Sequence, residues 1–136
     1  LKSRIKQNNL EDDVILCGPI YDRVELSYYY QRADLLLFPS IYDTSAIVRI
    51  EAASQETPGL FLKNTATATT ITDNINGFLS DNTIGAYSDR IIEIMKDKEL
   101  YNKVSKNSYI DLYKNWSDQV SEAYQIYLEL INKTKH

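Results

Sequence analysis

The stretch at residues 33–56, ADLLLFPSIYDTSAIVRIEAASQE, constrains the fold more than any other part of the chain. Residues 34–38 contain a continuous apolar run, which is typical of a strand that is covered on both faces. Pro39 ends this run, because proline has no amide to donate to a sheet. The Asp-Thr-Ser sequence at residues 43–45 favours a helix start, and residues 46–54 predict a helix with a narrow apolar stripe. The stretch therefore predicts a strand, a loop and a helix in succession.

Strands and helices alternate along the rest of the chain. Further strands are predicted where short apolar runs end at turn residues, at residues 14–17, 59–62 and 78–79. Helices are predicted at residues 22–32, 84–95 and 98–113 and from residue 115 onwards. This alternation predicts an α/β fold, a Rossmann-like parallel sheet of about four strands with helices on both faces. Because four strands are few and the first residue is Leu1, we expect residues 1–136 to be a partial domain that ends in helices.

The composition is that of one ordinary globular domain, with 136 residues, 43% of them hydrophobic and 25% charged. A net charge of −4 argues against nucleic acid as a partner. Cys17 lies in an apolar run and has no second cysteine to pair with, so we expect it to be buried. An unpaired cysteine suits a reducing, cytoplasmic location, and no apolar run is long enough to span a bilayer.

Loops at the carboxyl ends of parallel strands are where open α/β sheets bind ligands, and a helix that begins there can hold an anion. Residues 39–46 have this position. Residues 63–72, KNTATATTIT, follow the next strand and are either a plain connection with a short helix or a second loop that faces the ligand. The sequence leaves both possibilities open.

Two structural roles are predicted outside these loops. Asn76 and Gly77 form a turn in which positive φ is available. Trp116 is predicted to anchor the last helix by packing against the domain.

Most catalytic motifs are absent from the sequence. The four glycines form no phosphate-binding loop, and the single histidine, His136, leaves neither a Ser-His-Asp set nor a zinc-binding cluster. What remains is a pair of carboxylates, Asp43 and Glu51, which bracket the start of a predicted helix. Eight helical residues span about 12 Å, so the two carboxylates would contact different parts of an extended ligand. The pair suits a diphosphate at the helix start with hydroxyl groups on either side.

Several motifs, in this order and spacing, resemble the C-terminal domain of glycosyltransferases of family 4, which have the B-type fold of two facing Rossmann-like domains. The resemblance covers residues 13–80, and the combination of motifs is more specific than any one of them. It is carried by Val14, Leu16 and Gly18, by Tyr30, Ala33, Asp34, Leu35, Leu37, Pro39 and Ser40, by Asp43, Glu51 and Ala52, by Thr57 and Pro58, and by Asp73, Asn74, Asn76, Gly77 and Leu79.

The resemblance implies a retaining enzyme that transfers a sugar from a nucleotide-diphosphate sugar, most commonly a UDP-sugar, to a glycan, lipid or protein acceptor. Asp43 occupies the position of the acidic residue that contacts the donor sugar, and Glu51 occupies that of the carboxylate that binds the ribose. The remaining donor contacts would be the backbone amides of Ser45, Ala46 and Ile47 with the diphosphate, and Pro19 and Ile20 near the base. No metal is expected, because no Asp-x-Asp cluster is present to hold a cation.

In the family, two more strands, an Arg and a Lys that neutralise the diphosphate, and the N-terminal acceptor domain lie upstream of the part that resembles this chain. The chain alone is therefore expected to have no transferase activity. Any association with the inner face of a membrane would come through the missing part.

The sequence departs from the family at two positions. Asp43 stands where the family has a glutamate followed by a glycine, and Glu56 stands where a glycine precedes the proline. The first departure favours an alternative hypothesis, in which the chain is a noncatalytic nucleotide-binding or regulatory α/β domain on the same scaffold.

Overall fold

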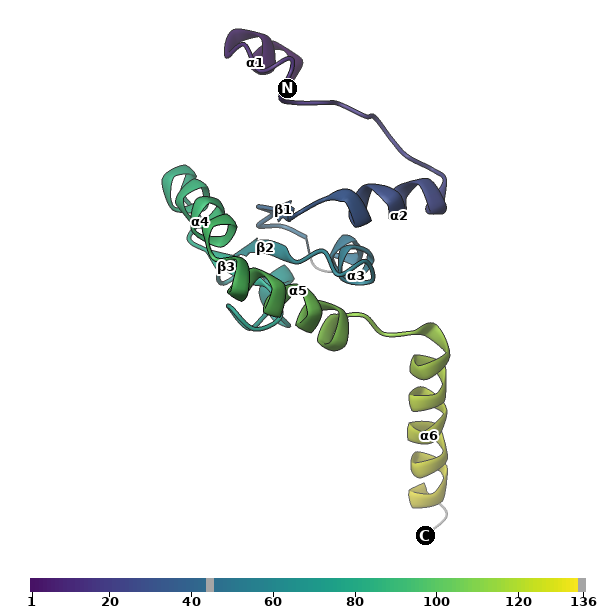
Figure 1. Cartoon of the computed structure of the whole chain (residues 1–136). Helices are drawn as coiled ribbons and strands as arrows, with labels where there is room; N and C mark the ends of the chain where they lie inside the picture. The colour runs from purple at the N-terminus through teal and green to yellow at the C-terminus, as the bar shows by residue number, and fades with distance from the viewer. Residues whose placement is uncertain (44–45, 135–136) are drawn as a thin grey trace.

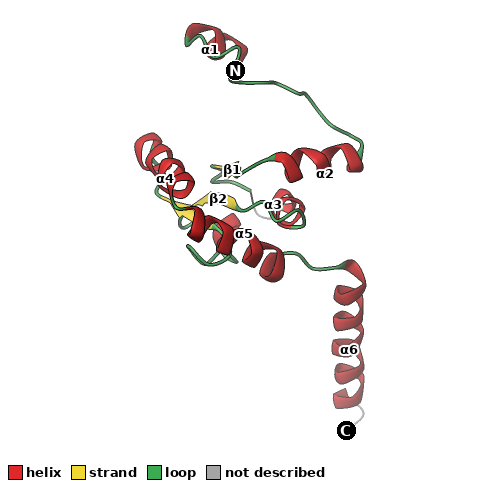
Figure 2. Ribbon diagram, in the orientation of Figure 1, coloured by secondary structure: helices red, strands yellow, loops and turns green. Residues whose placement is uncertain are grey.

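The computed structural model describes residues 1–43 and 46–134, and within them it contains a three-stranded parallel sheet (Figures 1 and 2). The strands, in their order across the sheet, are β1 (Leu36–Phe38), β2 (Gly59–Leu62) and β3 (Phe78–Ser80). The other elements are α1 (Lys2–Gln7), α2 (Arg23–Arg32), α3 (Ile47–Ala53), the 3₁₀ helix η1 (Ala66–Ala68), α4 (Ile84–Lys96), α5 (Lys98–Leu112) and α6 (Trp116–Thr134). The parallel, Rossmann-like sheet with helices on both faces is confirmed, with three of the predicted strands present.

The core is built around the central strand, β2, in which every residue is buried. Successive side chains of a strand point to opposite faces, so Leu60 and Phe61 enter two different clusters. Leu60 packs with Phe78, Ile94 and Val104, which brings α4 and α5 onto one face of the sheet. Phe61 packs with Ala68 and Ile71 on the other face. The sheet is therefore covered on both sides, which explains why its strands appear in the sequence as continuous apolar runs.

Helices α2, α4 and α5 each begin at a residue whose side chain caps the helix. The carboxylate of Asp22 accepts hydrogen bonds from the amides of Val24 at 2.8 Å and Glu25 at 2.9 Å, so α2 begins where the sequence predicts. Thr83 caps α4 and Asp97 caps α5 in the same way.

The turn after α3 has the hydrogen bonds of a Schellman motif. The amide of Thr57 donates to the carbonyl of Ala52 at 3.0 Å, and the amide of Glu56 donates to the carbonyl of Ala53 at 3.0 Å. Glu56 adopts a φ of 56°, the left-handed conformation that glycine usually supplies in this motif. The chain then passes through the buried Thr57 into β2.

The turn before β3 differs from the prediction. Positive φ occurs at Asn74, with a φ of 61°, and neither Asn76 nor Gly77 adopts it. Gly77 is constrained by space instead, because a Cβ atom there would lie 3.0 Å from the Cγ2 of Ile71. The side-chain oxygen of Asn76 accepts from the amide of Thr72 at 2.8 Å, and this hydrogen bond holds the two ends of residues 72–76 together.

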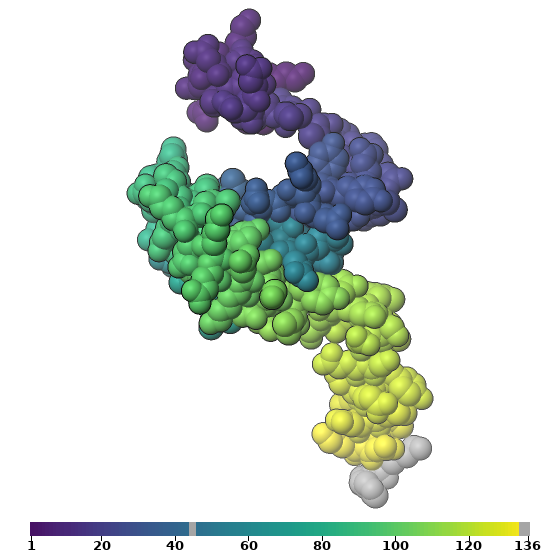
Figure 3. Space-filling view, in the orientation of Figure 1, coloured from purple at the N-terminus to yellow at the C-terminus, as the bar shows by residue number. Residues whose placement is uncertain are grey.

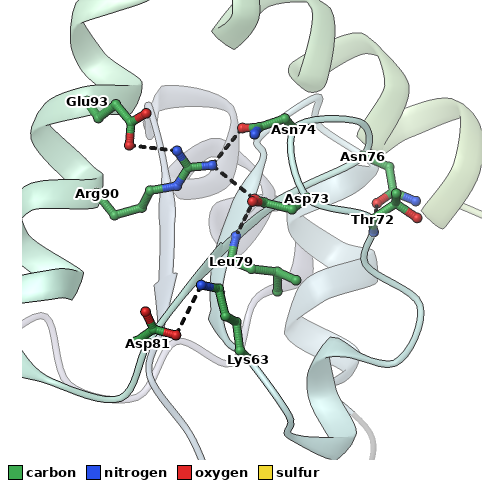
Figure 4. A network of polar contacts seen from close by, with 9 residues as sticks. All are labelled: Lys63, Thr72, Asp73, Asn74, Asn76, Leu79, Asp81, Arg90 and Glu93. Carbon is green, nitrogen blue, oxygen red and sulfur yellow. Dashed lines mark hydrogen bonds and ion pairs between the residues drawn. The ribbon is translucent and has the colours of Figure 1, made fainter.

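A polar network centred on Arg90 of α4 fixes this turn to the sheet (Figure 4). The Arg90 guanidinium donates to Asp73 at 3.0 Å, to Asn74 at 2.6 Å and to Glu93 at 2.7 Å. Asp73 also accepts from the amide of Leu79 in β3 at 2.8 Å. Burial opposes the charge of Arg90, but its bonds with Glu93 and Asp73 outweigh burial and raise its pKa. The network therefore ties α4, the turn and β3 together.

The N-terminal segment, residues 1–22, contradicts two predictions. Residues 14–17, predicted as a buried strand, form no strand, and Val14, Ile15 and Leu16 are exposed. Cys17, predicted to be buried, is exposed as well. A strand requires a neighbour that satisfies its backbone hydrogen bonds, and no strand of the described residues pairs with this segment. Figures 1 and 3 show α1 and this segment apart from the sheet.

The C-terminal helix α6 projects from the domain at the opposite end (Figure 3). Trp116 was predicted to pack, but its side chain is 81% exposed. The apolar residues along α6, including Tyr124 and Tyr127, are also exposed. The helix is amphipathic, but the described residues offer no surface that covers its apolar side. No helix of the described residues has the length and the apolar character that crossing a membrane requires.

Candidate functional site

The loop that joins β1 to α3 lies at the carboxyl end of a parallel strand, where the sequence placed the candidate site. Asp43 belongs to this loop and is half-buried. Residues 44–45 lie outside the described residues, so the predicted role of Ser45 concerns a residue that the structure does not describe. Ala46 precedes α3 and is buried, with 2% of its surface exposed.

The N-cap residue of helix α3 provides no side-chain cap. This residue is Ala46, which has no polar side-chain atom and makes no side-chain hydrogen bond. The next residue, Ile47, is 63% exposed. The first amides of a helix have no partner within the helix, and a helix start is a place where an external acceptor such as phosphate can bind.

The second loop at this edge of the sheet follows β2 and contains a turn and η1, which matches the plain-connection possibility for residues 63–72. The hydroxyl of Thr65 donates to the carbonyl of Leu62 at 2.8 Å and lies 2.9 Å from the hydroxyl of Thr67. Thr67 is 1% exposed. The hydroxyl groups of Thr65 and Thr67 therefore serve the internal hydrogen bonding of the loop.

Arg49 of α3 bonds to the loop that follows β2, and it is not among the residues that the sequence predicts for the site. Its Nη1 atom donates to the carbonyl of Thr67 at 2.6 Å, and burial lowers the pKa of its guanidinium. A cation in the first turn of a helix opposes the helix dipole, and this was the signal in the sequence that could have identified Arg49.

Glu51 lies two residues after Arg49 in α3, and its carboxylate is held by two residues of α2. Arg23 forms an ion pair with Oε1, and the hydroxyl of Tyr30 donates to Oε2 at 3.2 Å. The Glu51 side chain is 23% exposed, so it is neither in the interior nor fully in solvent. These three residues line a cavity of about 210 Å³ between α2 and α3. Neither partner of Glu51 could be identified from the sequence, because Tyr30 and Arg23 are 21 and 28 positions away from it.

Pro19 and Ile20 lie in the segment without regular structure that leads to α2. Pro19 is exposed and Ile20 is partly buried. Only two residues separate Ile20 from Arg23, whose side chain contacts Glu51. Sequence proximity therefore places this loop near Arg23, at the N-terminal end of α2.

Among the described residues, no three His, Cys, Asp or Glu side chains are grouped in a way that could hold a metal ion. The expected independence from metal stays a prediction.

The parallel sheet is covered on both faces, and a loop and a helix that carry two carboxylates follow the carboxyl end of β1. This arrangement defines the chain as a Rossmann-like α/β domain. The family model for glycosyl transferases group 1 matches residues 1–111, and the chain belongs to this family. No curated protein matches the sequence.

Solved structures share this fold. Sucrose-phosphate synthase from Thermosynechococcus elongatus superposes with a TM-score of 0.82 at 26% identity, over 97% of this chain and 34% of that protein. The C-terminal domain of a group 1 glycosyl transferase from Francisella tularensis gives 0.70 at 24% identity, over 79% of this chain and 56% of that one. Anabaena HepE, solved with UDP and glucose, gives 0.74 at 20% identity, over 96% of this chain and 35% of that one. The chain therefore spans about a third of the length of sucrose-phosphate synthase and HepE.

Proposed function

We propose that this chain is the donor-binding part of a retaining glycosyltransferase, which transfers a sugar from a nucleotide-diphosphate sugar to a glycan, lipid or protein acceptor. The observation that carries the proposal is the family match over residues 1–111, which include both Asp43 and Glu51. HepE, which shares the fold, has been solved with UDP-glucose, and this makes UDP-sugars the first donors to test.

The chemistry of the site supports this function. The leaving group of the reaction is a diphosphate, and backbone amides fixed at a helix opening stabilise the charge that develops on it. In the proposal these amides belong to Ser45, Ala46 and Ile47. Glu51 accepts hydrogen bonds from the ribose hydroxyl groups, Asp43 contacts the donor sugar, and the loop at residues 19–20 lies near the base.

The remaining two thirds of such an enzyme would complete the site. We propose that further strands join the sheet at the free edge of β1, which pairs with β2 on one side only. Residues 14–17 would then find the neighbour that they lack here, and they would become the predicted strand. The upstream part would also supply the cations that neutralise the diphosphate and the acceptor domain. Independence from metal and a cytoplasmic location, including the inner face of a membrane, belong to this proposal.

The test is the substitution Glu51→Gln in the full-length protein that contains these residues, with Glu129→Gln on the exposed surface of α6 as the control. A hydrogen bond to a charged group contributes about 1.5–3 kcal/mol, so Glu51→Gln should weaken UDP binding about tenfold or more. Calorimetry measures UDP binding, and product analysis with UDP-, GDP- and ADP-sugars measures transfer.

Three outcomes are informative. Loss of UDP affinity and transfer in Glu51→Gln alone, with an unchanged melting temperature, supports the proposal. Equal affinities in the wild type and in both variants would overturn the role of Glu51. UDP binding without transfer from any donor would favour the noncatalytic nucleotide-binding domain, which the aspartate at position 43 makes the second candidate.

A further inference from the structure

The Glu51 carboxylate is held from one side by the side chains of α2. The hydroxyl of Tyr30 and the guanidinium of Arg23 each bond to a different oxygen. Tyr30 is also fixed through its backbone, because its carbonyl accepts from the buried hydroxyl of Thr57 at 2.6 Å. Thr57 belongs to the turn that follows α3, so the position of Tyr30 is tied to the same unit that carries Glu51.

We propose that Tyr30 is a positioning residue, which orients the Glu51 carboxylate for the two hydroxyl groups of a ribose. The inference rests on the proposed function, in which Glu51 binds the ribose of the donor. A carboxylate has about four lone-pair positions, and Tyr30 and Arg23 use one position on each oxygen. One position on each oxygen remains, which matches a pair of neighbouring hydroxyl groups.

Tyr30 rather than Arg23 is the residue that fixes the orientation. The Arg23 side chain is 79% exposed, and a solvent-exposed ion pair holds its geometry weakly. Tyr30 is partly buried, has only two side-chain torsions and is anchored by Thr57. Burial and the neighbouring Glu51 raise the pKa of Tyr30 to about 12, so its hydroxyl stays protonated and donates to Glu51 at neutral pH. A fixed acceptor loses less conformational entropy when the ligand binds.

The experiment measures the affinities of UDP and of a dideoxy analogue that lacks both ribose hydroxyl groups, in the full-length wild type and in Tyr30→Phe. Tyr87→Phe is the matched control, because the hydroxyl of Tyr87 is also part-buried and donates to the carbonyl of Leu60 at 2.9 Å, within the core. The wild type should bind UDP about tenfold or more tightly than the analogue. In Tyr30→Phe, UDP binding should weaken by about three- to tenfold, while binding of the analogue changes less than about twofold.

Equal losses for UDP and the analogue in Tyr30→Phe would overturn the inference, because a merely structural role affects both ligands alike. An unchanged preference for UDP in Tyr30→Phe would overturn it as well. If the wild type does not distinguish UDP from the analogue, the ribose-binding role of Glu51 fails, and the inference fails with it. Tyr87→Phe should keep the preference of the wild type for UDP.

Discussion

Replacing Glu56 with glycine should stabilise the domain. Glu56 lies in the turn after α3 and has a φ of 56°, a conformation that is unfavourable for an L-residue by roughly 1–2 kcal/mol because its Cβ approaches the backbone. Glycine removes this strain, but it loses about 0.5–1 kcal/mol more conformational entropy on folding. The hydroxyl of Ser105 donates to the carbonyl of Glu56 at 2.6 Å, and this backbone contact does not depend on the side chain. We therefore expect a net gain of about 0.5–1 kcal/mol in the free energy of unfolding.

Urea denaturation followed by circular dichroism measures this gain, and a melting curve should shift upwards by about 2–5 °C. Two variants serve as controls. Glu56→Ala removes the charge but keeps the strained conformation, so its stability should stay near that of the wild type. Gln55→Gly places glycine one residue earlier, where φ is not positive, and should lose about 0.5–1 kcal/mol. If Glu56→Gly is no more stable than Glu56→Ala, the reasoning from backbone strain is refuted.

Two further predictions concern the polar contacts and the titration of the domain. Asp73→Ala should lower the free energy of unfolding by about 2 kcal/mol, because it removes the carboxylate that pairs with the mostly buried Arg90 and leaves the amide of Leu79 without its acceptor. Asp81→Ala, which breaks only the exposed pair with Lys63, should lower it by less than about 0.5 kcal/mol in the same urea titration. Burial raises the pKa of Tyr87 from 10.0 to about 12, so its contribution to stability is complete below pH 10 and is lost as the pH rises to 12. The free energy of unfolding of Tyr87→Phe should therefore fall less than that of the wild type between pH 10 and 12. Parallel plots of the free energy of unfolding against pH for the two proteins would contradict this.

The sequence predicted the elements whose signals are local. The apolar runs that become β1, β2 and β3 are bounded by proline, glycine or turn residues, and each forms within two residues of its predicted bounds. Asp22 starts α2 because its carboxylate reaches the amides of its own first turn. Such elements depend on contacts between residues close in sequence, so they can be predicted without knowledge of the fold.

The wrong predictions concern segments whose structure depends on distant partners. Residues 14–17 have the composition of a strand, but a strand forms only where another strand pairs with it, and no strand among the described residues does so. Trp116 and α6 have an apolar side, but nothing in the described residues covers it. Hydrophobic patterning identifies the face that should be buried and does not say what buries it.

The candidate site shows the same division between local and distant information. The spacing of Asp43 and Glu51 was visible in the sequence, whereas the bonds from Arg23 and Tyr30 to Glu51 arise only when α2 packs on α3. These bonds help to decide whether the Glu51 carboxylate is available to bind a ligand. A carboxylate with a purely structural role is most stable when its partners enclose it, yet the Glu51 side chain stays 23% exposed beside a cavity. The packing of α2 thus restricts the motion of this carboxylate and leaves it accessible, as a binding residue requires.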